Sequence, residues 1–351
     1  MSKLIASIFF GWFNLSFACT SFGVITESET IIGKNRDFMY SQQNFELVQP
    51  IRQFDGWYGN PYQHKNEFYA LMARNDVKFG VNKFGLVAIE EDPMFPTNAS
   101  NNRRYMQPYL GYSEGMTLYG ILQNFSSVNE IIPYINQIFS ISAPNFYQIA
   151  DSHSILTVEV AFGDTESSPT RKFSYKIINK AGDYFTHTNT YLDKNFEKLN
   201  QLPNINLYSI DGSKNRLNKI TNYVKNANGD FSNAFNWYLD TKSAIKSPDN
   251  KKFCLNTSVF RSDIKMLTKI RYNTQSDTVY GTVSSFMVQY KGSNAQVHVR
   301  VFYSLDVLKN GDQKITYNEL NIPLDKLFLA DKLDYTMHSF IRKAPVNETC
   351  N

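Results

Sequence analysis

The chain is poor in the residues that usually hold metals. Its 351 residues include three cysteines and five histidines. No histidine has a second one four residues away or a cysteine beside it; the five are His64, His153, His187, His298 and His338. Zinc sites need such side chains at short, regular spacing. We therefore expect no metal site and no cofactor.

Long apolar runs and dense charge are also missing. No stretch after residue 18 has eighteen uninterrupted apolar residues, which excludes an integral membrane segment there. The formal net charge is +4 without a dense basic run, so nucleic acid is not an expected partner. With 42% hydrophobic residues the chain can bury a sizeable core. Without repeats or a low-complexity linker, we expect one domain over residues 19–351.

Common nucleophile motifs are absent as well, and neither a Walker loop nor a G-x-S-x-G elbow occurs. The N-terminus instead has Lys3, the apolar run Leu4–Phe10 and then Ser16-Phe17-Ala18. This is the layout of a signal peptide cleaved after Ala18, and it predicts export to the periplasm or the medium. Cleavage would leave Cys19 with a thiol and a free α-amine on one carbon, as in hydrolases with an N-terminal nucleophile.

Other fates of Cys19 stay open. It could be a lipid attachment point, although lipidation usually needs Leu where Ser16 stands, or it could be half of a disulfide. A leader retained as an anchor is a further alternative. Cys254 and Cys350 could pair in an oxidising compartment, but the sequence does not show whether they lie close enough.

Strand signals dominate the chain. The segments 21–25 and 30–32 predict a hairpin turning at Glu27-Ser28-Glu29, which would bring residues 34–37 beside Cys19. Further strands are expected at 45–48, 68–72, 78–81, 86–89, 147–160, 173–178, 184–188, 278–280, 283–290 and 297–303.

Helix signals are fewer. They begin near Ser113, and Ser127-Val128-Asn129-Glu130 is a capping box. Amphipathic helices are expected at 213–226 and 231–245. Strands, then helices, then strands again indicate an α+β protein with helices outside a large antiparallel core.

Five motifs, taken in order, resemble the choloylglycine hydrolase and penicillin V acylase family and the related acyl-coenzyme A:6-aminopenicillanic acid acyltransferases. They are Cys19-Thr20-Ser21-Phe22, Gly33-Lys34-Asn35-Arg36-Asp37-Phe38, Gly80–Leu86, Phe185–Leu192 and Gly212–Leu217. The resemblance covers roughly residues 19–290. It implies a four-layer αββα sandwich in which two antiparallel sheets lie between helices, with an N-terminal cysteine as nucleophile.

The resemblance also implies roles around Cys19. Asp37 would hold the α-amine of Cys19. Lys34 stands where the family usually has arginine, which orients the nucleophile and lowers the thiol pKa. Lysine keeps the charge but loses the planar fork. Arg36, on the same face of the predicted strand, is the alternative carrier of this charge.

Two further residues follow from the same motifs. Asn189 would donate its amide to the oxyanion of the tetrahedral intermediate, and Arg216, at the start of a helix beginning near Ser213, would lie close to the nucleophile. Thr190 replaces a family histidine, which bears on the substrate class. A second oxyanion donor is expected where the chain has Glu90-Glu91-Asp92; it is not recovered, and Asp92 becomes a predicted substrate contact.

The substrate expected from this reading is a small N-acylated amine or amino acid, cleaved at a linear, non-peptide amide bond. Trp57 and Tyr58 are candidates for binding an apolar acyl group if they lie over the cleft, and core residues otherwise. An acyltransferase on the same fold and a lipid-anchored binding protein are the alternatives. The oligomeric state, including a homo-oligomer, stays open.

Overall fold

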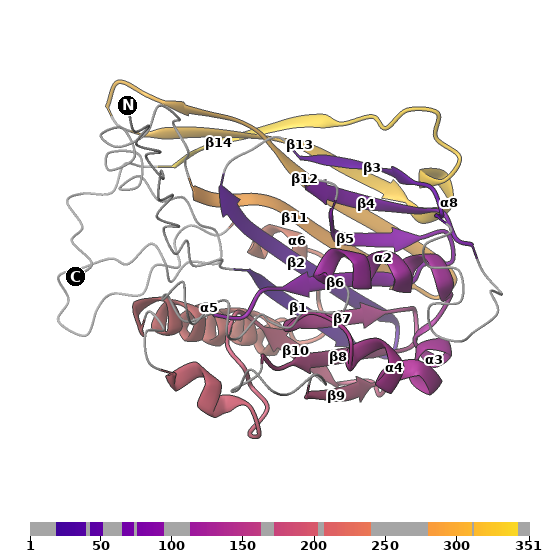
Figure 1. The fold of residues 1–351 in the computed structure, drawn as a ribbon. Coiled ribbons are helices and arrows are strands. Elements are labelled where there is room, and N and C mark those ends of the chain that lie inside the picture. The colour runs from indigo at the N-terminus through magenta and orange to yellow at the C-terminus, as the bar shows by residue number, and fades with distance from the viewer. Residues whose placement is uncertain are drawn as a thin grey trace, which may run out of the picture.

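The computed structural model describes residues 19–39, 43–51, 65–73, 76–94, 113–162, 172–202, 207–239, 280–310 and 312–342. Two antiparallel sheets of seven strands each make up its centre (Figure 1). The first sheet has the order β10 (Tyr184–His187), β1 (Thr20–Ile25), β2 (Glu29–Met39), β11 (Tyr280–Lys291), β12 (Asn294–Val307), β13 (Gln313–Pro323) and β14 (Thr336–Arg342). The second has the order β3 (Asn44–Val48), β4 (Phe68–Ala73), β5 (Asp76–Asn82), β6 (Val87–Glu91), β7 (Asn145–Ala150), β8 (Ile155–Val160) and β9 (Phe173–Ile178).

The sheets pack face to face through one buried apolar layer. Ile32 and Phe286 of the first sheet belong to the same cluster as Phe79 and Ile89 of the second. The rings of Phe79 and Phe286 stack with centroids 4.5 Å apart. Because successive strand residues point to opposite faces, this layer uses alternate residues of each strand and leaves the others for the outer layers.

Helices cover both outer faces. On the second sheet lie α2 (Glu114–Asn124), α3 (Val128–Ile131) and α4 (Ile135–Phe139), and the first sheet carries α5 (Leu207–Asn226) and α6 (Ala234–Trp237). A single-turn helix, α8 (Leu324–Leu327), follows β13, and short 3-10 helices cover Ile132–Tyr134 and Glu197–Gln201. The order is helices, sheet, sheet, helices (Figure 1), which confirms the predicted αββα fold class.

The hairpin of β1 and β2 forms as predicted. Thr26 closes its turn, with the Thr26 amide donating to the Glu29 carbonyl at 2.8 Å. The register pairs Thr20 with Asn35, so the end of β2 returns to the start of β1. The capping box is present too, because the Glu130 amide donates to the Ser127 hydroxyl at 3.4 Å.

Several boundaries differ from the predictions. The helix expected over 213–226 begins at Leu207, and Gly212 is tolerated within it at a modest cost. The expected strand 147–160 is two strands, β7 and β8. Strands β13 and β14 were not predicted. Among the described residues, no helix is both long and apolar enough to cross a bilayer.

Candidate active site

Strand direction brings the predicted residues to one end of the first sheet. Cys19 immediately precedes β1, and Asp37 lies near the end of the antiparallel β2. On the other side, β10 pairs Ser21 with His187, and Asn189 follows that strand by two residues. Extending the β1–β2 register by one residue places Cys19 level with Arg36, while Asn189 lies in the bend that follows β10.

Cys19 is buried, with 4% of its surface exposed. Burial raises the pKa of its thiol to about 12, against the opposing charge of Lys34 and with smaller contributions from Glu90, Glu91 and Asp37. The thiol is therefore protonated at neutral pH. Only a thiolate is strongly nucleophilic, so this cysteine needs a base to act.

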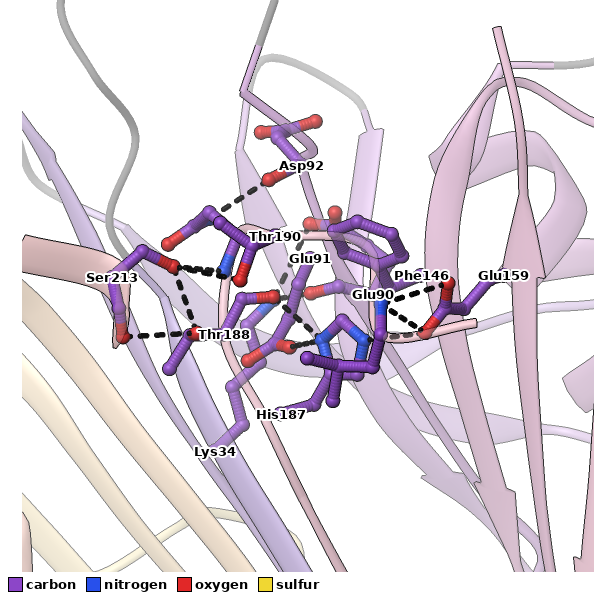
Figure 2. Close-up of polar contacts among 12 residues, drawn as sticks. Lys34, Glu90, Glu91, Asp92, Phe146, Glu159, His187, Thr188, Thr190 and Ser213 are labelled. Atoms are coloured by element: carbon purple, nitrogen blue, oxygen red, sulfur yellow. Dashed lines mark hydrogen bonds and ion pairs between the residues drawn. The ribbon is translucent and has the colours of Figure 1, made fainter. Parts of the chain in front are cut away.

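Lys34 crosses from the first sheet to the second. Its ammonium is fully buried, donates to the backbone carbonyl of Glu90 and makes a 3.4 Å ion pair with the Glu90 carboxylate (Figure 2). Burial would raise the pKa of Glu90, but Lys34 and Lys78 outweigh it and hold that pKa below its usual value. The positive charge of Lys34 is thus neutralised within the protein.

Arg36 and Asp37 are neighbours on β2 and point to opposite faces. Asp37 is buried and accepts a 2.6 Å hydrogen bond from the Thr282 hydroxyl of β11. The guanidinium of Arg36 lies over the Phe38 ring, 4.5 Å from its centroid. Lys34 and Arg36 share the face of β2 that meets the second sheet, because Ile32, two residues earlier on that face, is in the layer between the sheets.

Asn189 is held at both ends of its side chain. Its Nδ2 donates to the Asp92 backbone carbonyl at 2.8 Å, and its Oδ1 accepts from Arg216 Nη2 at 2.9 Å. Arginine has donors only, so the Arg216 bond fixes which end of the Asn189 amide is the oxygen. Nδ2 is therefore oriented as a donor.

Helix α5 fixes the backbone of the same loop. The Asn189 backbone amide donates to the Ser213 hydroxyl at 3.1 Å. The Thr188 and Ser213 hydroxyls are hydrogen-bonded at 2.8 Å (Figure 2). The Ser213 hydroxyl also reaches that of Thr190 at 3.4 Å. The structure thus ties the segment after β10 to α5.

His187 lies between two carboxylates of the second sheet (Figure 2). Its Nδ1 is 3.1 Å from Glu91 Oε2 and its Nε2 is 3.2 Å from Glu159 Oε1. Burial alone would lower the pKa of His187, but the hydrogen bonds that it donates to Glu159 and Glu91 raise that pKa to about 9. We define His187, Glu91 and Glu159 as the histidine clamp. It joins the two sheets beside the Asn189 segment.

Asp92 follows β6 and is partly exposed. Its Oδ1 accepts a 3.3 Å hydrogen bond from Asn145 Nδ2. Burial, reinforced by the charges of Glu90 and Glu114, raises the pKa of Asp92 to about 7. The site therefore has a carboxyl group that changes charge near neutral pH.

Comparison of the sequence with known protein families identifies the family of this chain. The sequence profile of the family described as acyl-coenzyme A:6-aminopenicillanic acid acyl-transferase matches residues 24–265. The chain belongs to this acyltransferase family. A search of curated proteins gave no match.

Solved structures similar to this acyltransferase family member include two of a conjugated bile acid hydrolase from Clostridium perfringens. One is 11% identical, with a TM-score of 0.42, and the match covers 95% of this chain and 100% of that chain. The other is 12% identical, with a TM-score of 0.40, covering 94% and 99%. An N-acylethanolamine-hydrolyzing acid amidase ortholog from Caenorhabditis elegans is 13% identical, with a TM-score of 0.35, covering 77% and 92%.

The structure of this family member brings most of the predicted residues together. Cys19, Lys34 and Asp37 lie at the end of the β1–β2 hairpin, and Asn189, Arg216 and Asp92 are connected by hydrogen bonds. Arg216 lies well inside α5 with 1% of its surface exposed, not at the start of a helix, so the prediction of its position was wrong. Trp57, Tyr58, Cys254, Cys350 and residues 1–18 lie outside the described residues.

Sequence reasoning missed the partners of these residues. Glu90 was noted only as replacing an expected donor, yet it neutralises Lys34. His187 belongs to one of the five motifs, but its clamp depends on Glu159, 28 residues away in the chain. A lone histidine carries no signal for such a contact. The alternation around β6, which buries Glu91 beside Val87 and Ile89, could have flagged a buried charge needing a partner.

Proposed function

We propose that this chain is an exported hydrolase of linear amide C–N bonds in small N-acylated substrates, with Cys19 as nucleophile after removal of residues 1–18. The observation that carries the proposal is the position of Cys19 at the same end of the β1–β2 hairpin as Asp37, next to strand β10, which Asn189 follows. Membership of a family described by acyl transfer supports chemistry at an acyl carbon.

The base comes from the cleavage itself. In the uncut chain the nitrogen of Cys19 is a peptide nitrogen and cannot take a proton. Once freed, it is an amine with a pKa near 8 beside a thiol. The amine takes the proton from Sγ, and the Asp37 carboxylate stabilises the ammonium that forms. A carboxylate accepts several hydrogen bonds, so the bond from Thr282 is compatible with this role.

Sγ then bonds to the acyl carbon, and negative charge develops on the carbonyl oxygen. Asn189 Nδ2 carries two hydrogens, of which one serves the Asp92 carbonyl and the second serves this oxyanion. As the C–N bond breaks, the ammonium of Cys19 returns its proton to the leaving amine. Water attacks the thioester, releases the acid and restores the free cysteine.

Acyl transfer to an amine is the second candidate, and the family profile is the observation that favours it. The acyl-enzyme is the same in both reactions, and only the group that attacks it differs. Incubating the enzyme with an N-acyl substrate and a competing amine decides between them. A new amide among the products shows transfer, and free acid alone shows hydrolysis.

N-terminal sequencing and intact mass of the exported protein test the proposal directly. A chain beginning at Cys19 with an unmodified amine supports it. A fatty-acylated Cys19, or a chain beginning elsewhere, refutes it, and acylation would instead favour the lipid-anchored binding protein. The matched functional test uses purified protein of both lengths, and only the form that begins at Cys19 should cleave amides.

A further inference from the structure

One buried guanidinium in the site has no acceptor. Arg36 is 5% exposed, and within the described residues its guanidinium makes no hydrogen bond or ion pair. Its Nη1 is fully enclosed without a partner, and the contact with the face of Phe38 leaves its donors unused. Lys34, two residues away on the same strand face, is by contrast paired with Glu90.

Two hydroxyls on the same face share this feature. Ser284 of β11 is the cross-strand partner of Arg36, and Ser21 of β1 lies diagonally across from it. Their hydroxyl oxygens are both buried and without a partner among the described residues. Paired residues of neighbouring strands lie on one face of a sheet. Arg36, Ser21 and Ser284 therefore form a group of polar side chains on the face that meets the second sheet; we name it the arginine cradle.

Burying the arginine cradle without a partner for its charge costs free energy. Buried charges are nearly always paired, because leaving one without a partner forfeits its solvation. The acidic groups nearby do not bind it: Glu90 binds Lys34, and Glu91 binds His187 through Oε2, while its buried Oε1 has no partner among the described residues. Arg36 does contribute to lowering the pKa of Glu90, but the two form no ion pair. The group lacks one anion with two acceptor oxygens.

The arginine cradle borders the nucleophile. The paired residues Thr20 and Asn35 stand next to Cys19 and Arg36 on their strands. Extending this register by one residue puts Cys19 opposite Arg36, so a substrate that reaches the thiol also comes within reach of the guanidinium. Planar guanidinium and planar carboxylate match in a bidentate pair.

We propose that the substrate carries a carboxylate close to the amide that is cleaved, and that Arg36 binds it with the help of Ser21 and Ser284. This inference rests on the proposed function and names its substrate class. The carboxylate belongs either to the leaving amine, as in an N-acyl amino acid, or to the acyl half, as in the monoamide of a dicarboxylic acid. Arg36 acts in specificity and takes no part in proton transfer.

The test compares matched substrates on wild type and Arg36→Gln. N-decanoylglycine and N-decanoylglycinamide differ only in the carboxylate on the amine half; N-glutaryl-butylamine and N-pentanoyl-butylamine differ in the carboxylate on the acyl half. A charged hydrogen bond contributes enough to predict a roughly 10- to 150-fold rise in KM for one acid in Arg36→Gln. The matched neutral substrate should change less than about twofold. Whichever acid is affected identifies the half that carries the charge.

Control variants distinguish binding of the carboxylate by Arg36 from the effect of removing any one positive charge. Lys83→Gln removes one exposed positive charge from a turn and should leave all four substrates unaffected. Arg36→Lys should recover part of the preference for the acid. Equal losses on acid and neutral substrates, or no loss on either acid, would overturn the inference. Arg36→Gln should keep or raise the melting temperature, since it removes an unpaired buried charge; a strong fall would mark Arg36 as structural and also overturn it.

A binding measurement keeps this inference distinct from the proposed function. In Cys19→Ala protein beginning at residue 19, the two acids should raise the melting temperature in proportion to their binding. The rise should vanish when Arg36→Gln is added. If wild type cleaves no amide but this binding is seen, the proposed function fails and the carboxylate site stands. If wild type cleaves amides and no Arg36-dependent binding or preference is found, only the carboxylate site fails.

Discussion

The layer between the two sheets has an apolar half and a polar end, built from the same strand faces. On β2 the face that carries Ile32 continues through Lys34 to Arg36, and on β6 the face that carries Ile89 continues to Glu91. In the apolar half, stacked rings hold the two sheets together. At the polar end, the ion pairs of the histidine clamp hold them together. The alternate residues of one strand face thus form the apolar core at one end and the candidate site at the other.

This contrast predicts that activity and stability can be lost separately. The largest effect should come from Cys19→Ala in protein beginning at residue 19. Removing the proposed nucleophile should lower kcat/KM by about 10⁴-fold or more, with the fold unchanged. Amide cleavage and a thermal melt measure the two properties. Retention of even a tenth of the activity would remove Cys19 from the mechanism.

The apolar half should respond in the opposite way. Phe286→Ala removes a fully buried ring that stacks on Phe79, and a cavity of this kind costs about 3–5 kcal/mol of unfolding free energy. Denaturant titration gives the cost, and activity per folded molecule should change little at low temperature. Phe286→Leu is the matched control and should lose less. A stable but inactive Phe286→Ala protein would contradict the division into two halves.

Within the polar end, Asn189 should matter for rate more than for stability. Asn189→Ala removes the proposed oxyanion donor, and kcat should fall about 10²- to 10³-fold with a small change in KM. Asn189→Asp is a second variant to test, because it keeps the shape of the side chain and puts negative charge where the proposed oxyanion forms. If that variant keeps full activity, Asn189 is not the donor.

The histidine clamp should give the smallest effect and a pH signature. The folded-state pKa of His187 is raised to about 9 from 6.5, so its contribution to stability is fully present below pH 6.5 and is lost as the pH rises through 9. His187→Gln should therefore cost about 2 kcal/mol at pH 6. The difference from wild type should shrink above pH 9. A cost that does not depend on pH would mean that His187 is held uncharged.

The sequence predicted the backbone elements better than it predicted the contacts between side chains. The hairpin, the capping box before α3 and strand β9 were predicted because each depends on residues close together in the chain. Strand β14 was missed because it is an edge strand with exposed Met337 and Ile341, so its alternation does not follow burial. Motif order also indicated the candidate residues Cys19 and Asn189.

The partners of those residues could not be predicted in the same way. Whether Lys34 or Arg36 is neutralised depends on β6, which pairs with neither β1 nor β2 and approaches them only when the sheets stack. The same holds for His187 and Glu159. Arg216 was expected at the start of a helix because the turns of α5 before Ser213 were not predicted. Contacts between layers decide these details.

The attachment of Asn189 to Ser213 has a consequence for engineering. Helix α5 lies on the outside of the first sheet, yet Ser213 binds the backbone amide of Asn189 and Arg216 fixes the orientation of its side chain. Under the proposed function, a small slide or rotation of this outer helix would move the oxyanion donor without any change in the sheets. Substitutions on the solvent side of α5, or an antibody bound there, therefore offer a remote control on turnover.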